Sequence, residues 1–245
     1  MESSRVRKAG LSLGATAVGV GVVMQVPMFL AARKHHYRLV GMAMDHWMIA
    51  GMGLILIGLV AVVVTLTPPR RLDLGATRSL SVAPLDDTKM GPAHLGMLGV
   101  LTLAIAIDSQ KPFTFAFILP GVASEYNLSS PGHHVAGAAP VALIALVGIA
   151  GTVVGSLVWG YVADRWGRRS AILIAAMIFL ATCACGAMPA FSDNLVMCFV
   201  MGLGAGGLLP IAYTLLAETI PARHRGQVVV LVAGVGTAAG FLLAS

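Results

Sequence analysis

Two opposite charges interrupt an apolar run at residues 96–119 of this sequence. Asp108 and Lys111 are three residues apart, so on a helix they share a face and can pair. Gln110 lies between them, and Pro112 follows, where it removes a backbone donor and favours a bend. Charged side chains inside a membrane segment are costly and usually face a cavity or a partner. Our hypothesis is that Asp108 is a proton or cation site, that Lys111 attracts an anion, and that Gln110 belongs to the same site. The alternative is an ion pair that only fixes helix packing.

The composition indicates that lipid is the solvent for most of this chain. Of its 245 residues, 58% are hydrophobic and only 11% are charged, and the mean hydropathy is +0.89. Soluble domains carry about 25% charged residues. The net charge of +6 comes from basic residues clustered between apolar runs. That placement fits loops beside anionic lipid and argues against a nucleic-acid partner.

Seven apolar segments are long enough, or nearly long enough, to cross a membrane, which takes about 20 residues. They lie at about 10–32, 47–67, 96–119, 136–161, 171–188, 195–216 and 228–245. The last segment carries no charge or polar anchor at its end. We therefore interpret the chain as a fragment that stops within a helix.

The lysine and arginine residues of the short loops predict the orientation of these segments. The connections rich in basic residues are expected in the cytoplasm, and these are 162–170, 217–227 and 68–95. The loops without any are expected outside, and these are 120–135 and 189–194. Residues 33–46 do not fit this rule: they carry Arg33, Lys34 and Arg38, yet should lie outside if both early segments span.

These patterns divide the chain into three parts. Residues 1–68 are predicted to form a two-helix membrane appendage, although 10–32 alone has an alternative interpretation as an uncleaved anchor or signal peptide. Residues 69–93 are rich in proline and form an irregular cytoplasmic linker. Residues 94–245 form the main membrane domain.

A glycine- and arginine-rich motif lies between two apolar segments on the predicted cytoplasmic side. It reads Gly160-Tyr-Val-Ala-Asp-Arg-Trp-Gly-Arg-Arg169. Gly160 would permit a close helix crossing and Gly167 a turn, whereas the simplest alternative is a basic stop-transfer loop. The motif resembles the signature loop between the second and third helices of the major facilitator superfamily. That resemblance implies a conformational latch made by Asp164 and Arg168, within a motif that also includes Arg165 and Arg169.

A second pattern lies in the segment at 195–216 and the loop that follows. It comprises Gly202, Gly204, Gly206, Gly207 and Pro210, and then Glu218, Arg223 and Arg225. It resembles the fourth helix and following loop of sugar-porter-like and metabolite-symporter-like members of the same superfamily. We expect the glycines and Pro210 to serve helix packing, and the three charged residues to form a second cytoplasmic charge cluster. Cys198 stands where the family pattern has an arginine linked to proton coupling or packing, so coupling through that position is in doubt.

The resemblance covers about residues 94–245 and implies an all-α membrane bundle, with about five of the six helices of an N-terminal half-transporter. It also implies that the segment at 96–119 lines a substrate path. The expected function is secondary active transport of a small polar solute, an organic anion or a sugar, by ion-coupled alternating access. The alternative is a half-transporter-derived assembly protein without transport of its own. The expected partners are the lipid bilayer, a small-molecule substrate, and either a missing C-terminal half or a second half-transporter. The expected location is the plasma (inner) membrane. No enzyme motif, cofactor or metal site is expected.

Overall fold

Helices make up most of the part of the chain that the structure describes, with turns and one isolated β-bridge between Ser129 and Pro140. The computed structural model describes residues 2–35, 39, 40, 42, 44–67, 91–131, 135–182 and 188–244. Its helices are α1 (Glu2–Val23), α2 (Val26–Ala31), the short 3-10 helix η1 (Ala32–His35), α3 (His46–Leu66), α4 (Pro92–Ser109), α5 (Lys111–Glu125), α6 (Ala142–Trp166), α7 (Arg168–Ala181), α8 (Phe191–Thr219) and α9 (Ala222–Ala244). Of the predicted linker at 69–93, only residues 91–93 are among the described residues.

Five stretches of the described chain are long and apolar enough to cross a membrane. They are Lys8–Ala31, His46–Leu66, Ala142–Trp166, Phe191–Thr219 and Arg223–Ala244. The last of them begins earlier than expected, because α9 starts at Ala222, directly after Pro221. With 23 residues, α9 is about 35 Å long and can span a bilayer.

Two of the predicted segments are broken in the middle, each beside a proline. The segment at 96–119 consists of α4 and α5, which meet at Gln110, because Pro112 has no N–H to donate to the carbonyl of Asp108. The segment at 10–32 consists of α1 and α2, which meet at Gln25, two residues before Pro27. Breaks of this kind inside a membrane are tolerated where they line a cavity or pack against protein.

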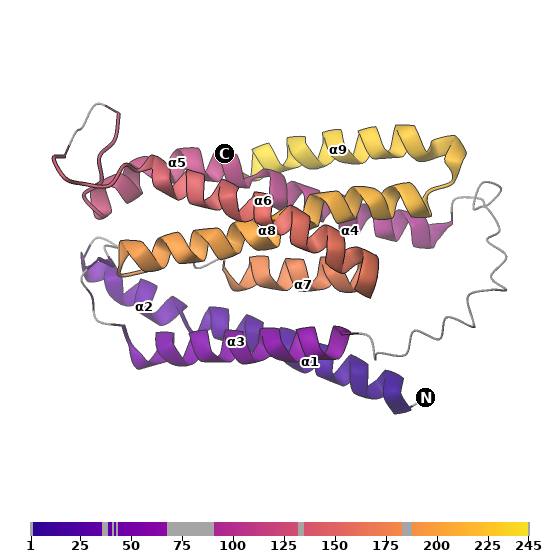
Figure 1. Cartoon of the computed structure of the whole chain (residues 1–245), viewed down its shortest axis with the longest axis horizontal. Helices are drawn as coiled ribbons and strands as arrows, with labels where there is room; N and C mark the ends of the chain where they lie inside the picture. Colours follow the sequence, from indigo (N-terminus) through magenta and orange to yellow (C-terminus); the bar gives the residue numbers. More distant parts are fainter. Residues whose placement is uncertain are drawn as a thin grey trace.

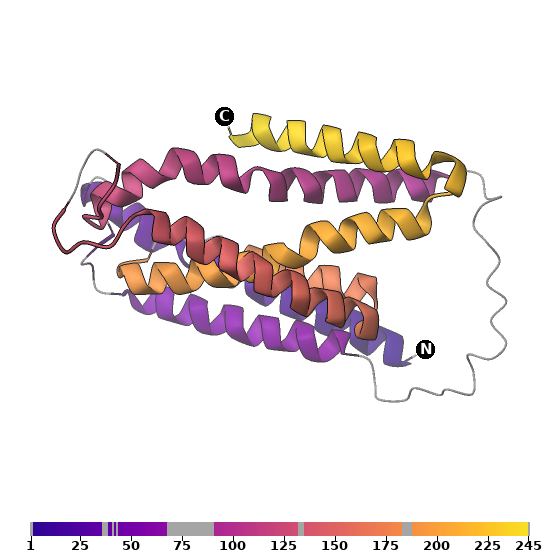
Figure 2. The same ribbon diagram turned by 45° about the horizontal axis from the view of Figure 1, so that its top comes forward.

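The helices run side by side along the long axis of the molecule (Figure 1). α1 and α3 form one edge, α7, α6 and α8 lie in the middle, and α4, α5 and α9 form the other edge (Figure 2). The α6–α7 and α8–α9 connections lie at the same end as the start of α4. Residues 126–131 and the end of α2 lie at the opposite end (Figure 1).

Two pairs of helices pack along glycine seams. In the first, a Cβ added to Gly21 or Gly51 would lie 2.7 Å from the carbonyl oxygen of the other, and a Cβ on Gly58 would lie 2.8 Å from the carbonyl oxygen of Gly14. These contacts bring the backbones of α1 and α3 together. Small residues allow such an approach in membranes, where association depends on van der Waals packing.

The second seam joins α8 to α6 and α7 through the four glycines that were expected to serve helix packing. Gly202 and Gly206 face α6, and a Cβ on Gly206 would lie 2.7 Å from the amide nitrogen of Ser156. Gly204 faces α7, and a Cβ on Gly204 would lie 2.9 Å from the amide nitrogen of Phe179. Gly207 faces the ring of Trp159. Trp159 also donates its indole N–H to the carbonyl of Leu203 at 2.8 Å.

Pro210 differs from these glycines because its side chain is exposed. The expectation that Pro210 serves helix packing is therefore wrong for the described chain.

Helices α1 and α3 pack against the later helices through α7. Val18 and Ile55 form a buried cluster with Ala181. In a second buried cluster, Val62 packs with Ala171 and Ile174. At the far end the backbone N–H of Leu39 donates a 2.8 Å hydrogen bond to the carboxylate of Glu125, at the end of α5. The appendage and the bundle therefore share a continuous interface that can contribute side chains to one site.

Candidate functional site

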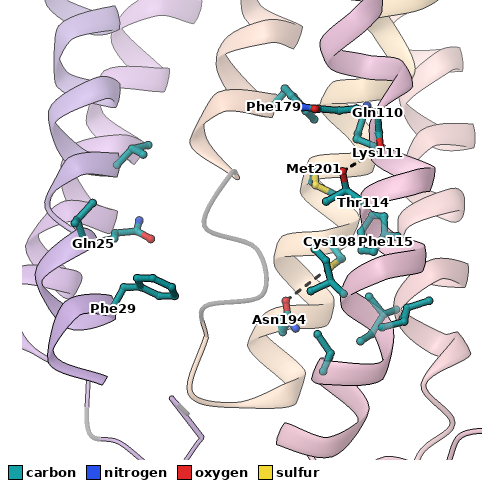
Figure 3. Close-up of a pocket in the computed structure, with 16 residues that line it drawn as sticks. Gln25, Phe29, Gln110, Lys111, Thr114, Phe115, Phe179, Asn194, Cys198 and Met201 are labelled. Atoms are coloured by element: carbon teal, nitrogen blue, oxygen red, sulfur yellow. Dashed lines mark hydrogen bonds between the residues drawn. The ribbon is translucent and has the colours of Figure 1, made fainter. Parts of the chain in front are cut away.

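A cavity of about 570 Å³ lies between the α1–α2 region and helices α5 to α8. Its walls come from the α1–α2 break, from α5, and from α6, α7 and α8. Most of the lining is apolar, with aromatic rings from Phe29, Phe115 and Phe179. The polar groups on it are few: Gln25, Gln110, Lys111, Thr114 and Asn194 (Figure 3). A mainly apolar wall with a small number of placed polar groups is typical of small-molecule sites.

Two of the three candidate residues from the apolar run reach this cavity. Gln110 and Lys111 line it, whereas Asp108 lies behind Lys111, outside the cavity lining. The Lys111 ammonium donates to the Asp108 carboxylate, which pairs the two charges. Their side chains are 16% and 7% exposed. Lys111 is therefore the charge that a solute in the cavity would meet, and Asp108 is the counter-ion that neutralises it when the cavity is empty.

The break between α4 and α5 brings this pair to the cavity wall. Gln110 keeps a helical backbone, with φ −68° and ψ −23°, and its N–H donates to the carbonyl of Ala106 at 3.2 Å. The chain therefore continues in nearly the same direction while one bond of the ladder is missing. The Lys111 ammonium also lies 4.5 Å from the centre of the Phe179 ring, which belongs to α7. The face of an aromatic ring attracts a cation.

Three polar residues of the lining lay outside the sequence hypothesis, namely Gln25, Thr114 and Asn194. Gln25 lies at the α1–α2 break, and Asn194 lies in the first turn of α8. Each is a polar residue beside an apolar run, which was the available signal. The expected segment begins at residue 195, whereas α8 begins at Phe191 and so includes Asn194. Cys198 lies one turn further along, and its thiol donates to Oδ1 of Asn194, with Sγ 3.7 Å from Oδ1. A thiol at this position leaves more room in the cavity than the arginine of the family pattern.

A second charged site lies at the end of the bundle that holds the α6–α7 connection. Arg168 pairs with Asp164 at 2.8 Å and with Glu218 at 3.2 Å. One guanidinium thus joins the glycine- and arginine-rich motif to the cluster that follows α8. The hydrogen bond to Glu218 raises the pKa of the Arg168 guanidinium above its ordinary value. Arg168 therefore stays charged at every physiological pH.

The two glycines of the motif have different surroundings. Gly167 separates α6 from α7 with φ +90° and ψ 149°, a conformation that other residues avoid. Gly160 has nothing within 4 Å of the position a Cβ would take. In the described chain Gly160 is therefore not at a close helix crossing, contrary to expectation.

The remaining arginines of the two clusters lie around this end of the molecule. Arg165 stacks on Tyr161, with 4.8 Å between the guanidinium carbon and the ring centre. Arg169 and Arg223 are exposed. Arg225 donates to the carbonyl of Ile220 at 3.5 Å, and so it helps to fix the α8–α9 turn.

Comparison with known proteins gives one family match over nearly the whole chain. The model of the Major Facilitator Superfamily matches residues 2–245, a range that includes α1 to α3. No solved structure is significantly similar to the chain.

Several characterised transporters are similar to parts of the chain. A niacin transporter, NiaP, of Acinetobacter baylyi is 32% identical over 151 residues, which is 61% of this chain and 33% of that protein. The cis,cis-muconate transport protein of the same organism is 28% identical over 51% of this chain and 29% of its own length. Organic cation/carnitine transporter 7 of Arabidopsis thaliana is 31% identical over 56% of this chain and 26% of its own length. The chain thus spans about a third of the length of the curated relatives that it matches.

Proposed function

We propose that this chain, which belongs to the Major Facilitator Superfamily, is the part of a secondary active transporter that binds a small organic anion and couples its movement to a proton. The family consists of membrane transporters and not of enzymes, and the five spanning helices make the chain an integral multi-pass membrane protein. The observation that carries the proposal is Lys111, a cation on the wall of a largely apolar cavity with its counter-ion behind it.

Charge balance explains how the pair would couple an anion to a proton. In the empty site Lys111 and Asp108 neutralise each other. An anion that pairs with Lys111 would leave the Asp108 carboxylate buried without a partner, which is strongly unfavourable. A proton added to the Asp108 carboxylate removes that charge, so the site stays neutral with the anion and one proton bound. Anion and proton then bind together and leave together.

The names of the relatives support a carboxylate as the solute. The niacin transporter and the muconate transport protein are named for small unsaturated carboxylates. Such a solute offers a carboxylate to Lys111 and a planar apolar body to the aromatic rings on the cavity wall. We therefore propose nicotinate and cis,cis-muconate as the first solutes to test.

The proposed domain organisation follows from the same site. Residues 1–68 would be a two-helix appendage that closes one wall of the cavity, 69–93 a linker, and 94–245 a partial N-terminal half. The pairing of Arg168 with Asp164 and Glu218 would act as the latch, because those contacts must break if α6, α7 and α8 move apart during alternating access.

Uptake into membrane vesicles tests the proposed transport. The protein that contains this sequence is expressed in its full length, and uptake of ¹⁴C-nicotinate and ¹⁴C-muconate is followed with and without an inward proton gradient. We expect the gradient to stimulate uptake at least tenfold. Lys111→Gln should abolish uptake, and Asp108→Asn should remove the stimulation. Uptake that is unchanged in both variants would exclude the proposal.

A second candidate is a membrane assembly protein without transport of its own. The observation that favours it is the exposed apolar face of α6, where Leu146, Ile149, Val153 and Leu157 are each more than half exposed and recur every three or four residues. Such a stripe suits a helix of another protein as well as lipid. Cross-linking from a cysteine placed at Val153 distinguishes the two: a single protein partner without any solute uptake supports assembly.

A further inference from the structure

Gln25 is a polar residue at the point where the first membrane segment breaks. The N–H of Gln25 bonds to the carbonyl of Val22 at 3.1 Å, a tight turn that replaces the regular ladder. Pro27 follows within two residues and cannot donate a backbone bond. Leucine or valine would satisfy the apolar surroundings of this break at lower cost. The sequence therefore has an amide where an apolar side chain would be more stable.

The amide of Gln25 has no partner within the described residues. The side chain is 8% exposed, and neither Nε2 nor Oε1 makes a hydrogen bond there. Figure 3 shows the amide directed from the α1–α2 break into the cavity, toward α5 and α8. Burying an amide without a hydrogen bond is unfavourable, so a group that occupies the cavity and pairs with it would relieve that cost.

We infer that Gln25 is a ligand-binding residue, and that it recognises a neutral group with a hydrogen-bond donor and an acceptor side by side, such as a carboxamide. A primary amide offers one acceptor and two donor hydrogens. When both of its ends are unpaired, a carboxamide can satisfy them together through two parallel hydrogen bonds. A carboxylate can accept from Nε2 but has no hydrogen to give to Oε1.

The opposite wall of the cavity selects for different chemistry. Lys111 lies at the start of α5 and Gln110 at the α4–α5 junction, across the cavity from Gln25 (Figure 3). The inference rests on the proposed function only in placing the solute in this same cavity, whose other wall would take a carboxylate. One cavity thus has a charged wall and a neutral polar wall, and each wall also carries an aromatic ring, Phe115 on α5 and Phe29 on α2. The appendage would then determine specificity as well as anchor the bundle.

Benzamide and benzoate test this inference, because they share a ring and differ only in the polar group. Binding of each ¹⁴C-labelled compound is measured by equilibrium dialysis on the purified 245-residue chain in lipid nanodiscs. Met replaces Gln25 with similar length and no amide. We expect Gln25→Met to weaken benzamide binding at least tenfold and to change benzoate binding by less than twofold.

A control and a stability measurement separate recognition from folding. Thr16 lies on α1, and its hydroxyl already donates to the carbonyl of Ser12. Thr16→Val removes this hydroxyl and should leave both affinities unchanged. The Tm of Gln25→Met without ligand should equal or exceed that of the wild type, because an unpaired amide is removed. If this Tm falls, Gln25→Leu is measured in the same way.

The possible results separate this inference from the proposed function. Unchanged benzamide binding in a folded Gln25 variant, equal loss of both compounds, or no binding of benzamide by the wild-type chain would overturn the inference. Loss of benzoate binding in Lys111→Gln, with benzamide binding retained, would still support the charged wall. The role of Gln25 can thus fail while the anion site stands, and the reverse is equally visible.

Discussion

The two ion-paired sites of this protein use similar residues in opposite surroundings. Asp108 and Lys111 are nearly covered by protein, whereas Asp164 is 69% and Glu218 is 52% exposed where they flank Arg168. A buried pair depends on both members, since a single buried charge is strongly unfavourable. An exposed pair is screened by water and salt and contributes little to stability. The first arrangement suits a binding step that must conserve charge, and the second suits contacts that must break repeatedly.

Removing one member of the buried pair should have the largest effect on stability. We expect Lys111→Met to lower the free energy of unfolding by about 3–5 kcal/mol, because the Asp108 carboxylate is left uncompensated. The double variant with Asp108→Asn should recover most of that loss. Unfolding by titration with SDS measures both. If the double variant is no more stable than Lys111→Met alone, the two charges are not coupled.

The turn between α6 and α7 should be the next most sensitive position. Gly167→Ala should cost about 1–3 kcal/mol, because φ +90° is strained for any residue with a Cβ. Gly160→Ala is the matched control within the same motif, and its open surroundings predict no measurable change. The two variants are compared by thermal unfolding in detergent. An equal loss for both would mean that Gly160 also packs against something.

Breaking the exposed site should have a small effect that depends on salt. Arg168→Gln removes both ion pairs, and we expect it to cost about 1 kcal/mol or less at low ionic strength. The difference should vanish in about 1 M salt, where the Debye length falls to roughly 3 Å. The buried pair should keep its full effect under the same conditions. A salt-independent loss in Arg168→Gln would contradict the contrast between the two sites.

The contact of Arg165 with Tyr161 should matter least. Both residues lie on the exposed side of the α6–α7 connection, where a cation over an aromatic ring contributes about 0.5–1 kcal/mol. We expect Tyr161→Leu to lower the free energy of unfolding by no more than that. Thermal unfolding measures it, with Tyr213→Leu on α8 as the comparison. A loss above about 2 kcal/mol would indicate a further contact of Tyr161.

Local patterns predicted five of the seven expected membrane segments and the α6–α7 turn, whereas 96–119 and 171–188 are not among the candidate spans of the described chain. Length and hydropathy are sufficient for a spanning helix, and Gly167 marks a turn whose backbone angle only glycine adopts readily. The break at Gln110 was also visible, because Pro112 removes a backbone donor wherever it occurs. Each of these features depends on residues close together in the chain.

The features that the sequence did not predict all depend on distant segments. Arg168 joins two clusters fifty residues apart that had been treated as separate. Gln25 belongs to the site because α1 and α3 pack on α7. That packing places Gln25 opposite α5 and α8. Pro210 and Gly160 were expected to pack against other helices, and such packing also depends on distant segments. In the described chain Pro210 is exposed, and no atom lies within 4 Å of a Cβ placed on Gly160.

Binding of an anion to the Asp108→Asn variant tests the central claim most directly. Equilibrium binding of ¹⁴C-nicotinate is measured on the purified wild-type protein, on Asp108→Asn and on Lys111→Gln. If Lys111 binds the anion and Asp108 competes for it, Asp108→Asn should bind nicotinate more tightly than the wild type and independently of pH. Lys111→Gln should not bind it. If Asp108→Asn weakens binding as much as Lys111→Gln does, the pair only holds the helices together and the proposed coupling is wrong.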